Sequence, residues 1–258
     1  MQSIGLKRTV ELIWVKASLN LRSEASVNYL SYAWWVIEPL LHMVVYYVVF
    51  SFLLARGGNN YVAFLLTGLI PWLWFAKTVS HTMGSILQGK QLMNQLYIPK
   101  IFFPLTFVLQ NSIKQIFVFT LLLVFLIFYG ISPSFVWFYS IPIILIQLLF
   151  IIGCSLLAAL IVPFIRDMSF VIPTGLQFMM FCSGIFFSHH DIPEHVQYYF
   201  FLNPMAVILA AFRDVLVDGV TPNFIQLGYV GIISMLLIVI AIWLYKKLEY
   251  VLPRVVLE

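Results

Sequence analysis

Six long apolar runs occupy most of this sequence and leave no segment that could fold as a water-soluble domain. Each run is long enough to cross a hydrocarbon core of about 30 Å as a helix that rises about 1.5 Å per residue. A backbone in lipid must satisfy its own hydrogen bonds, so helices are expected and open strands are not. The sequence therefore predicts an all-α integral membrane protein with six transmembrane helices per chain, at residues 33–54, 62–83, 108–129, 135–162, 170–187 and 224–245.

The charged residues are few and unevenly placed. Only 9% of the chain is charged, against about 25% in soluble proteins. If the first span leaves the cytoplasm, most basic residues fall on the cytoplasmic side, which is the positive-inside pattern and puts both termini in the cytoplasm. The net charge of +4 therefore indicates a membrane orientation, and we expect no nucleic-acid partner. The basic residues on that side are Lys7, Arg8, Lys16, Arg22, Lys90, Lys100, Arg166, Lys246, Lys247 and Arg254.

One transmembrane domain, 1–258, accounts for the whole chain. Residues 1–32 hold an amphipathic helix and lead-in, 33–187 hold spans one to five, and 224–258 hold span six and a cytoplasmic tail. Apolar residues recur on one stripe of the first helix, which is typical of an interfacial helix on the inner leaflet. A helix packed on the protein itself fits the same pattern, and both arrangements can hold together.

The outer segment 188–223 contains two apolar stretches, 196–202 and 205–212, that are too short to cross a bilayer. Asn203-Pro204 separates them, because proline removes a backbone donor and clashes with the preceding turn. We expect a re-entrant helical hairpin between spans five and six, with a helical cap on the outer surface as the alternative. Asn203, Pro204, Arg213 and Asp214 are the candidate outer gate, with Arg213 and Asp214 paired or facing a water-filled vestibule.

No set of residues in this sequence matches a catalytic or metal-binding pattern. Residues 84–91 approach a phosphate-binding loop, but Gln91 stands where Ser or Thr would hold magnesium and a membrane helix precedes the loop. The histidines of 189–195 lack metal-ligand spacing, and we expect them to lie in a solvated loop on the outer side. We therefore expect no catalytic residue, no metal site and no cofactor in this chain, and ATP with Mg²⁺ only on a partner.

Span one is rich in aromatic residues and contains a carboxylate. Trp34, Trp35, Glu38, Tyr46 and Tyr47 are the candidates for lining a substrate pore, since aromatic faces stack on apolar sugar faces. Core packing is the alternative for the aromatic residues, and Glu38 could simply reach water at the inner end of its span. Lys77 and Lys114 are expected to extend their charged ends toward the membrane surface.

Seven motifs in order over nearly the whole chain resemble the membrane subunit of type-2 ABC exporters for polysaccharides. This resemblance implies a homodimer, two separate ATP-binding cassette subunits docked on the cytoplasmic side, and a lipid-linked glycan as cargo in the bacterial inner membrane. The motifs are YLSYAW (29–34) leading to Glu38-Pro39, FLLTGLIPWLWF (64–75), LYIPKIFFP (96–104), FIRDM (164–168), SGIFF (183–187), LNPM (202–205) and FRDVL (212–216).

The resulting prediction is a transporter permease that exports a polysaccharide, with undecaprenyl-linked O-antigen first among the cargoes. Capsule, teichoic-acid or drug export by the same family is the alternative. An intramembrane acyl or glycosyl transferase would need a convergent acid–base set, and a passive channel would need no ATPase. The inner turns offer the docking points for the ATPase, and Lys90, Lys100, Arg166 and Asp167 are the candidate contacts.

Overall fold

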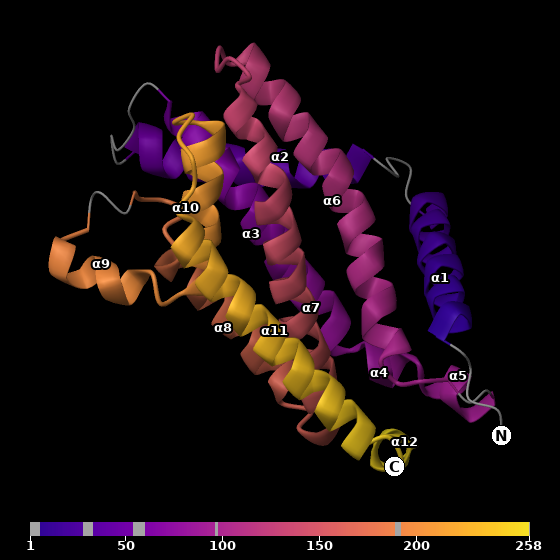
Figure 1. Ribbon diagram of the computed structural model, residues 1–258. Helices are drawn as coiled ribbons and strands as arrows, with labels where there is room; N and C mark the ends of the chain where they lie inside the picture. Colours follow the sequence, from indigo (N-terminus) through magenta and orange to yellow (C-terminus); the bar gives the residue numbers. More distant parts are fainter. Residues whose placement is uncertain (1–5, 28–32, 54–59, 96–97, 189–191, 258) are drawn as a thin grey trace.

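The computed structural model describes residues 6–27, 33–53, 60–95, 98–188 and 192–257, and within these ranges the secondary structure is helical, without strands. Four helical segments are long and apolar enough to cross a membrane. They confirm four of the predicted spans and run side by side along the molecule (Figure 1). These segments are α3 (Tyr61–Met83), α6 (Phe102–Phe128), α7 (Ser140–Phe164) with the preceding 3₁₀ turn η3 (Phe135–Tyr139), and α11 (Phe224–Lys247).

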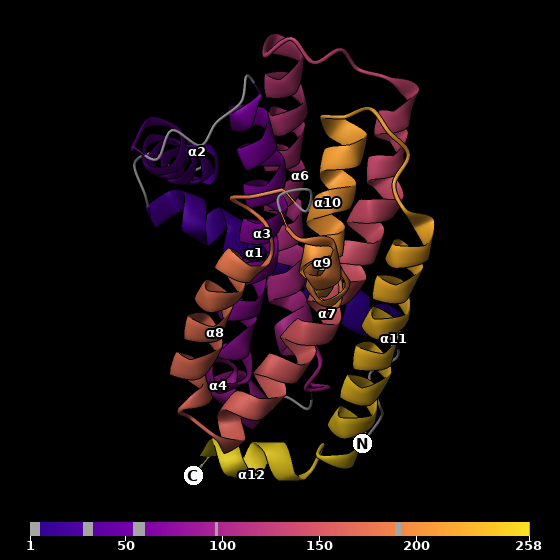
Figure 2. The same ribbon diagram turned by 90° about the vertical axis from the view of Figure 1, so that its left-hand side faces the viewer.

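The other two predicted spans take a different form. α2 (Trp34–Tyr47) continues as a short π-helical segment, η2 (Val48–Leu53), and lies crosswise to the long helices in both views (Figures 1 and 2). α8 (Met168–Cys182) is apolar but has 15 residues, short of a full crossing. By length and composition, the described residues thus provide four spans, or five if one bent helix pair counts as a span.

α3 is the centre of the molecule and contacts α2, α6, α7, α8 and α10. Its residues Leu65, Leu69 and Trp72 are almost wholly buried, because apolar residues on several faces of this helix meet a neighbouring helix. α7 and α11 approach closely at Gly153, where an added Cβ would lie 2.8 Å from the Leu237 Cβ. Small residues permit such contacts between membrane helices.

The bent pair consists of α9 (Glu194–Phe200) and α10 (Pro204–Leu216), whose axes differ by 109°. The break expected at Asn203-Pro204 is confirmed, since Asn203 accepts a hydrogen bond from the Met205 backbone N–H and Pro204 begins the next helix. α10 is buried along most of its length and packs on α3 and α7. None of the residues of α9 is buried.

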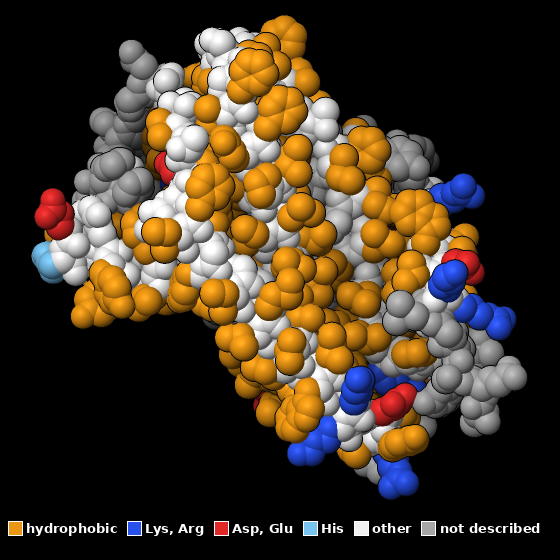
Figure 3. All heavy atoms as spheres, viewed as in Figure 1, with side chains coloured by type: hydrophobic (Ala, Val, Ile, Leu, Met, Phe, Trp, Pro, Cys, Tyr) orange, Lys and Arg blue, Asp and Glu red, His pale blue; other side chains and the backbone are white. Residues whose placement is uncertain are grey.

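α1 (Leu6–Val27) packs lengthwise on α6, with Ile13 and Ala17 buried and Trp14 exposed. The helix begins at the end of the molecule that also holds α4 (Ser85–Gln88), α5 (Lys90–Gln95) and α12 (Val251–Leu257) (Figure 1). Lys and Arg side chains gather toward this end, whereas hydrophobic side chains cover the flank of the long helices (Figure 3). A surface of this kind suits a bilayer, with the basic end in contact with water.

Candidate functional site

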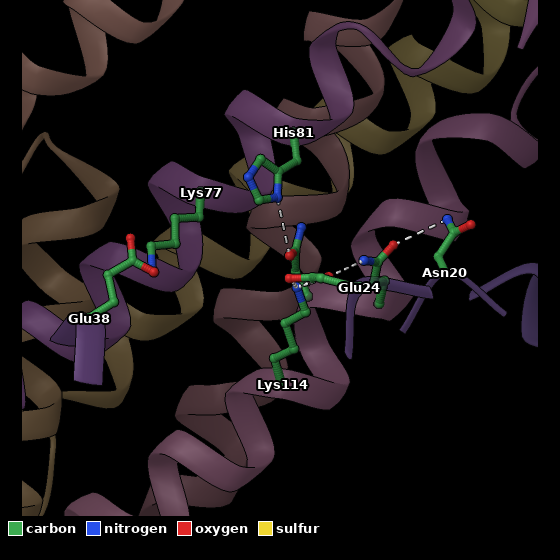
Figure 4. A network of polar contacts seen from close by, with 8 residues as sticks. Asn20, Glu24, Glu38, Lys77, His81 and Lys114 are labelled. Carbon is green, nitrogen blue, oxygen red and sulfur yellow. Dashed lines mark hydrogen bonds and ion pairs between the residues drawn. The ribbon is translucent and has the colours of Figure 1, made fainter. Parts of the chain in front are cut away.

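A polar cluster lies within the apolar bundle where α1, α2, α3 and α6 meet (Figure 4). Lys77 Nζ on α3 lies 2.5 Å from a carboxylate oxygen of Glu38 on α2. Lys114 Nζ on α6 lies 2.5 Å from each carboxylate oxygen of Glu24 on α1. The first ion pair joins the successive helices α2 and α3, and the second joins α1 to α6, which are distant in the sequence.

Amide groups extend the Lys114–Glu24 pair, and a histidine forms a separate contact in the same cluster. Gln110 donates to Glu24 at 2.9 Å and accepts from Asn20 Nδ2 at 3.2 Å. His81 Nδ1 lies 3.4 Å from Asn111 Oδ1, and because that oxygen can only accept, the histidine nitrogen is the donor. Side chains thus connect α1 with α6, and the separate His81–Asn111 contact connects α3 with α6 (Figure 4).

These pairs explain how charged residues are accommodated inside the bundle. An ionised side chain among apolar helices is costly, and pairing it lowers that cost. The sequence predicted that Lys77 and Lys114 extend toward the membrane surface, and the structure adds a carboxylate partner from another element for each of them. Gln110 and Lys114, four residues apart on one helix face, were the signal available in the sequence for a polar face on α6.

A cavity of about 130 Å³ lies against this cluster, and we call it the polar cavity. Several buried atoms in its wall have no hydrogen-bond partner among the described residues, namely Trp74 Nε1, Thr78 Oγ1, Asn111 Nδ2 and Gln115 Nε2. Buried polar atoms in proteins are nearly always paired with protein groups, water or a ligand. The polar cavity is therefore suited to a ligand that accepts hydrogen bonds.

The candidate pore residues fall into two groups. Trp34, Trp35 and Glu38 line the polar cavity together with residues of α3 and α6. Tyr47 lies at the far end of α2, is exposed, and does not line this cavity. The side chain of Tyr46 lies outside the described part of the structure. A pore-lining role for these residues stays a prediction.

Arg213 is directed inward, although the sequence suggested a pair with Asp214 or a position in a vestibule. Its guanidinium donates to the backbone oxygens of Gly184 at 2.6 Å, Ile185 at 2.9 Å and Phe64 at 3.3 Å. The guanidinium carbon also lies 3.6 Å from the centre of the Phe64 ring. Arg213 thus joins α10 to the start of α3 and to the segment after α8.

The remaining gate candidates lie around the same junction. Asn203 donates through Nδ2 to the Ser183 hydroxyl at 2.9 Å while its oxygen caps α10. Pro204 occupies the first position of α10, where its missing N–H costs nothing. Asp214 is half-buried on α10. The gate role of these four residues stays a prediction.

The candidate docking residues lie at the basic end of the molecule. Lys90 begins α5, and Arg166 and Asp167 form the exposed turn between α7 and α8. Lys100 is different, because it is 7% exposed and its ammonium donates to the Ile98 backbone oxygen. Burial lowers the pKa of Lys100, and the nearby Glu249 acts against that shift. A surface contact through Lys100 is therefore less accessible than the sequence suggested.

Within the described residues, no group of three or more His, Cys, Asp or Glu side chains lies close enough together to hold a metal ion. His189, His190 and Asp191, part of the histidine-rich outer loop, lie outside the described residues.

Comparison with known proteins agrees with this membrane architecture. Residues 13–217 match the model of the family described as "ABC-2 type transporter". An "O-antigen export system permease protein RfbA" of Klebsiella pneumoniae is 29% identical over 241 residues, which cover 93% of each chain. A "Polysialic acid transport protein KpsM" of Escherichia coli is 24% identical over 250 residues, which cover 94% of each chain. Since the family match spans most of the sequence, this chain belongs to the ABC-2 type transporter family.

Proposed function

We propose that this chain is the membrane subunit of an ATP-driven exporter that moves a lipid-linked polysaccharide out of the cytoplasm, with undecaprenyl-linked O-antigen as the leading cargo. The observation that carries the proposal is the similarity, over nearly the full length, to permeases named for O-antigen export. Relatives named for capsule or polysialic acid export are less similar, at 24–25% identity. Capsule export is therefore the second candidate.

The architecture supports transport. The long apolar helices need a membrane, and the polar cluster among them provides hydrogen-bonding groups where lipid alone would provide none. Polar and charged residues inside a membrane protein are expensive and therefore usually functional. A transferase would need reactive groups that converge on a substrate, whereas the lysines and glutamates of this cluster are paired with each other.

The functional unit in this proposal contains two copies of the chain and two ATP-binding subunits in a bacterial inner membrane. Six spans in this proposal require α2 with η2 to turn from its crosswise position and cross the membrane, and α8 to cross it together with the residues that follow. The pair α9–α10 would then re-enter the outer leaflet as a hairpin. Both termini lie in the cytoplasm in this proposal, which the positive-inside distribution of basic residues supports.

Deletion of the gene in its host tests this function. We expect polymer-length O-antigen to disappear from lipopolysaccharide on gels while undecaprenyl-linked chains accumulate inside the cell. Expression of the wild-type chain should restore the surface polymer, and expression without the ATP-binding partner should not. Normal O-antigen combined with loss of capsule would show that the cargo is capsule polysaccharide. Unchanged levels of both polymers would contradict polysaccharide export.

A further inference from the structure

Two cavities adjoin each other across α3 and α6. The first is the polar cavity described above. The second, which we call the apolar cavity, measures about 240 Å³ and lies between α3, α6 and α7. Pro71, Phe119, Ile144, Leu148 and Phe212 contribute to its wall. Trp74 and Gln115 line both cavities, so the two spaces meet at these side chains.

Unpartnered hydrogen-bond donors are concentrated at this junction. Trp74 Nε1 and Gln115 Nε2 are buried without a partner, and Asn111 Nδ2 adds a third such nitrogen in the polar cavity. Trp74 is 6% exposed and Asn111 is 7% exposed. All three atoms can only donate. A ligand that satisfies them must therefore present several acceptor oxygens close together.

Charge narrows the choice of ligand. Lys77, Lys114 and His81 line the polar cavity, and the two glutamates there balance the lysines. An anion would enter a site that is close to neutral in net charge and rich in neutral donors. A phosphate ester fits these conditions, since its oxygens form short, strong hydrogen bonds with N–H groups.

The apolar cavity supplies the second half of the site. Its wall is mostly aliphatic and aromatic. On α6 the wall includes the exposed residues Ile116 and Thr120, so the hydrocarbon chain of a lipid can enter from the bilayer. We propose that the two cavities together bind one membrane lipid that carries phosphate, with the phosphate in the polar cavity and one hydrocarbon chain in the apolar cavity. A phospholipid and a polyprenyl phosphate share this chemistry.

The depth of the junction distinguishes such a lipid from an ordinary neighbour in the bilayer. Trp74 lies nine residues before Met83, the last residue of α3, which corresponds to about 14 Å along the helix. A bilayer lipid that merely surrounds the protein keeps its phosphate at the membrane surface. A phosphate at Trp74 would be held inside the leaflet, which requires specific donors.

Native mass spectrometry of the full-length chain tests the proposal, with its ATP-binding partner present where the two co-purify. The probes are dioleoylphosphatidylethanolamine, undecaprenyl phosphate and dioleoylglycerol, the last of which lacks phosphate. We expect retention of the phosphate-bearing probes over dioleoylglycerol. The double variant Trp74→Phe/Gln115→Leu removes two donors while keeping apolar bulk and should weaken that retention about tenfold or more, since one strong hydrogen bond contributes a factor of this order.

Matched controls separate the site from general effects on folding. Trp72→Phe makes the same change two residues away on α3, and Trp72 lines neither cavity. Thr120→Trp should block the apolar cavity. Leu121→Trp makes a similar change at the next residue of α6, which does not line the apolar cavity. Both control variants should retain lipid as the wild type does.

The outcomes divide clearly. Preference for undecaprenyl phosphate over the phospholipid supports the site and assigns it to the exported cargo. Preference for the phospholipid supports the site independently of the proposed export function. Equal retention of dioleoylglycerol, or unchanged retention by both Trp74→Phe/Gln115→Leu and Thr120→Trp, overturns the proposal and leaves the unpartnered donors to be hydrated by water.

Discussion

At the scale of single residues, Arg213 shows how one buried cation can organise a junction of helices. A guanidinium has five N–H donors in a fixed plane, and here it contacts three backbone oxygens that belong to two different segments. The Gly184 and Ile185 oxygens lie where the chain turns after the end of α8, whereas the Phe64 oxygen lies in the first turn of α3 and also accepts a hydrogen bond from the Thr67 hydroxyl. Arg213 therefore supplies donors to two backbone oxygens beyond the end of α8 that an apolar side chain in its place could not supply.

Gly68→Ala should disturb this junction. A Cβ on Gly68 would lie 2.5 Å from Arg213 Nη2 and 3.3 Å from its Cζ, so the guanidinium would have to move away from its carbonyl partners. We expect a loss of stability of about 1–3 kcal/mol, which is typical of overpacked interiors. Thermal unfolding of the detergent-purified chain measures this effect.

Gly228→Ala is the matched control for that substitution. It places the same methyl group on helix α11, where no atom lies within 4 Å. Alanine is a better helix former than glycine, so this variant should be as stable as the wild type or slightly more stable. Equal destabilisation by both variants would show that the contact with Arg213 is not the cause.

The Lys114–Glu24 pair should show energetic coupling. Lys114→Met leaves the Glu24 carboxylate without its cation, so the single variant should be destabilised, and adding Glu24→Gln should recover part of the loss. Because the Lys114 side chain is 14% exposed and that of Glu24 is 40% exposed, we expect a coupling of about 1–3 kcal/mol, between surface and buried pairs. A double-mutant cycle based on thermal unfolding measures it.

Lys16→Met serves as the comparison for that cycle, because it removes a lysine from the exposed part of α1. It should change stability little and should not be rescued by Glu24→Gln. Strictly additive effects of Lys114→Met and Glu24→Gln would contradict a functional ion pair between α1 and α6.

At the scale of elements, the turns at the basic end should be the contacts with the ATP-binding subunit. Helix α5, which begins at Lys90, and the α7–α8 turn, which contains Arg166, lie toward the same end of the molecule (Figure 1). After replacement of the native Cys154 and Cys182, Lys90→Cys and Arg166→Cys should form crosslinks to the partner. Arg166→Glu should reverse the charge at the contact and abolish export while the chain stays in the membrane.

Asp218→Cys is the control for the crosslinking experiment. Asp218 is exposed in the segment between α10 and α11, and that segment lies at the end of the bundle opposite the basic end (Figure 1). It should form no crosslink to the ATP-binding subunit. Crosslinks from cysteines in α1 together with none from Lys90→Cys or Arg166→Cys would assign the docking surface to the amphipathic helix instead.

At the scale of the whole molecule, local signals predicted the elements and non-local contacts decided their arrangement. The four long helices follow from unbroken apolar runs, and the bend before α10 follows from Asn203-Pro204. Hydropathy measures the cost of exposing a segment to water and does not give its direction, so the crosswise position of α2 was not predictable. The partners of Lys77 and Lys114 lie on other elements, and the spacing of residues within one helix does not reveal pairs between helices.

The whole molecule is predicted to need an ATP-binding partner. The segment that approaches a phosphate-binding loop is helical here: the backbone N–H groups of Gln88 and Gly89 donate to the oxygens of Gly84 and Ser85. A phosphate-binding loop needs such N–H groups to point at the nucleotide. We therefore expect the purified chain to show no ATP hydrolysis above background, and a coupled-enzyme assay of the lone protein measures this directly.

Co-expression with the ATP-binding subunit should yield a stable complex of two plus two subunits. Light scattering corrected for detergent should give a membrane component equal to two copies of the 29.8 kDa chain, as the proposed assembly requires. The complex should hydrolyse ATP, and a variant of the partner that cannot hydrolyse ATP is the control. ATP turnover by the lone chain, or a complex with a single copy of it, would contradict this assembly.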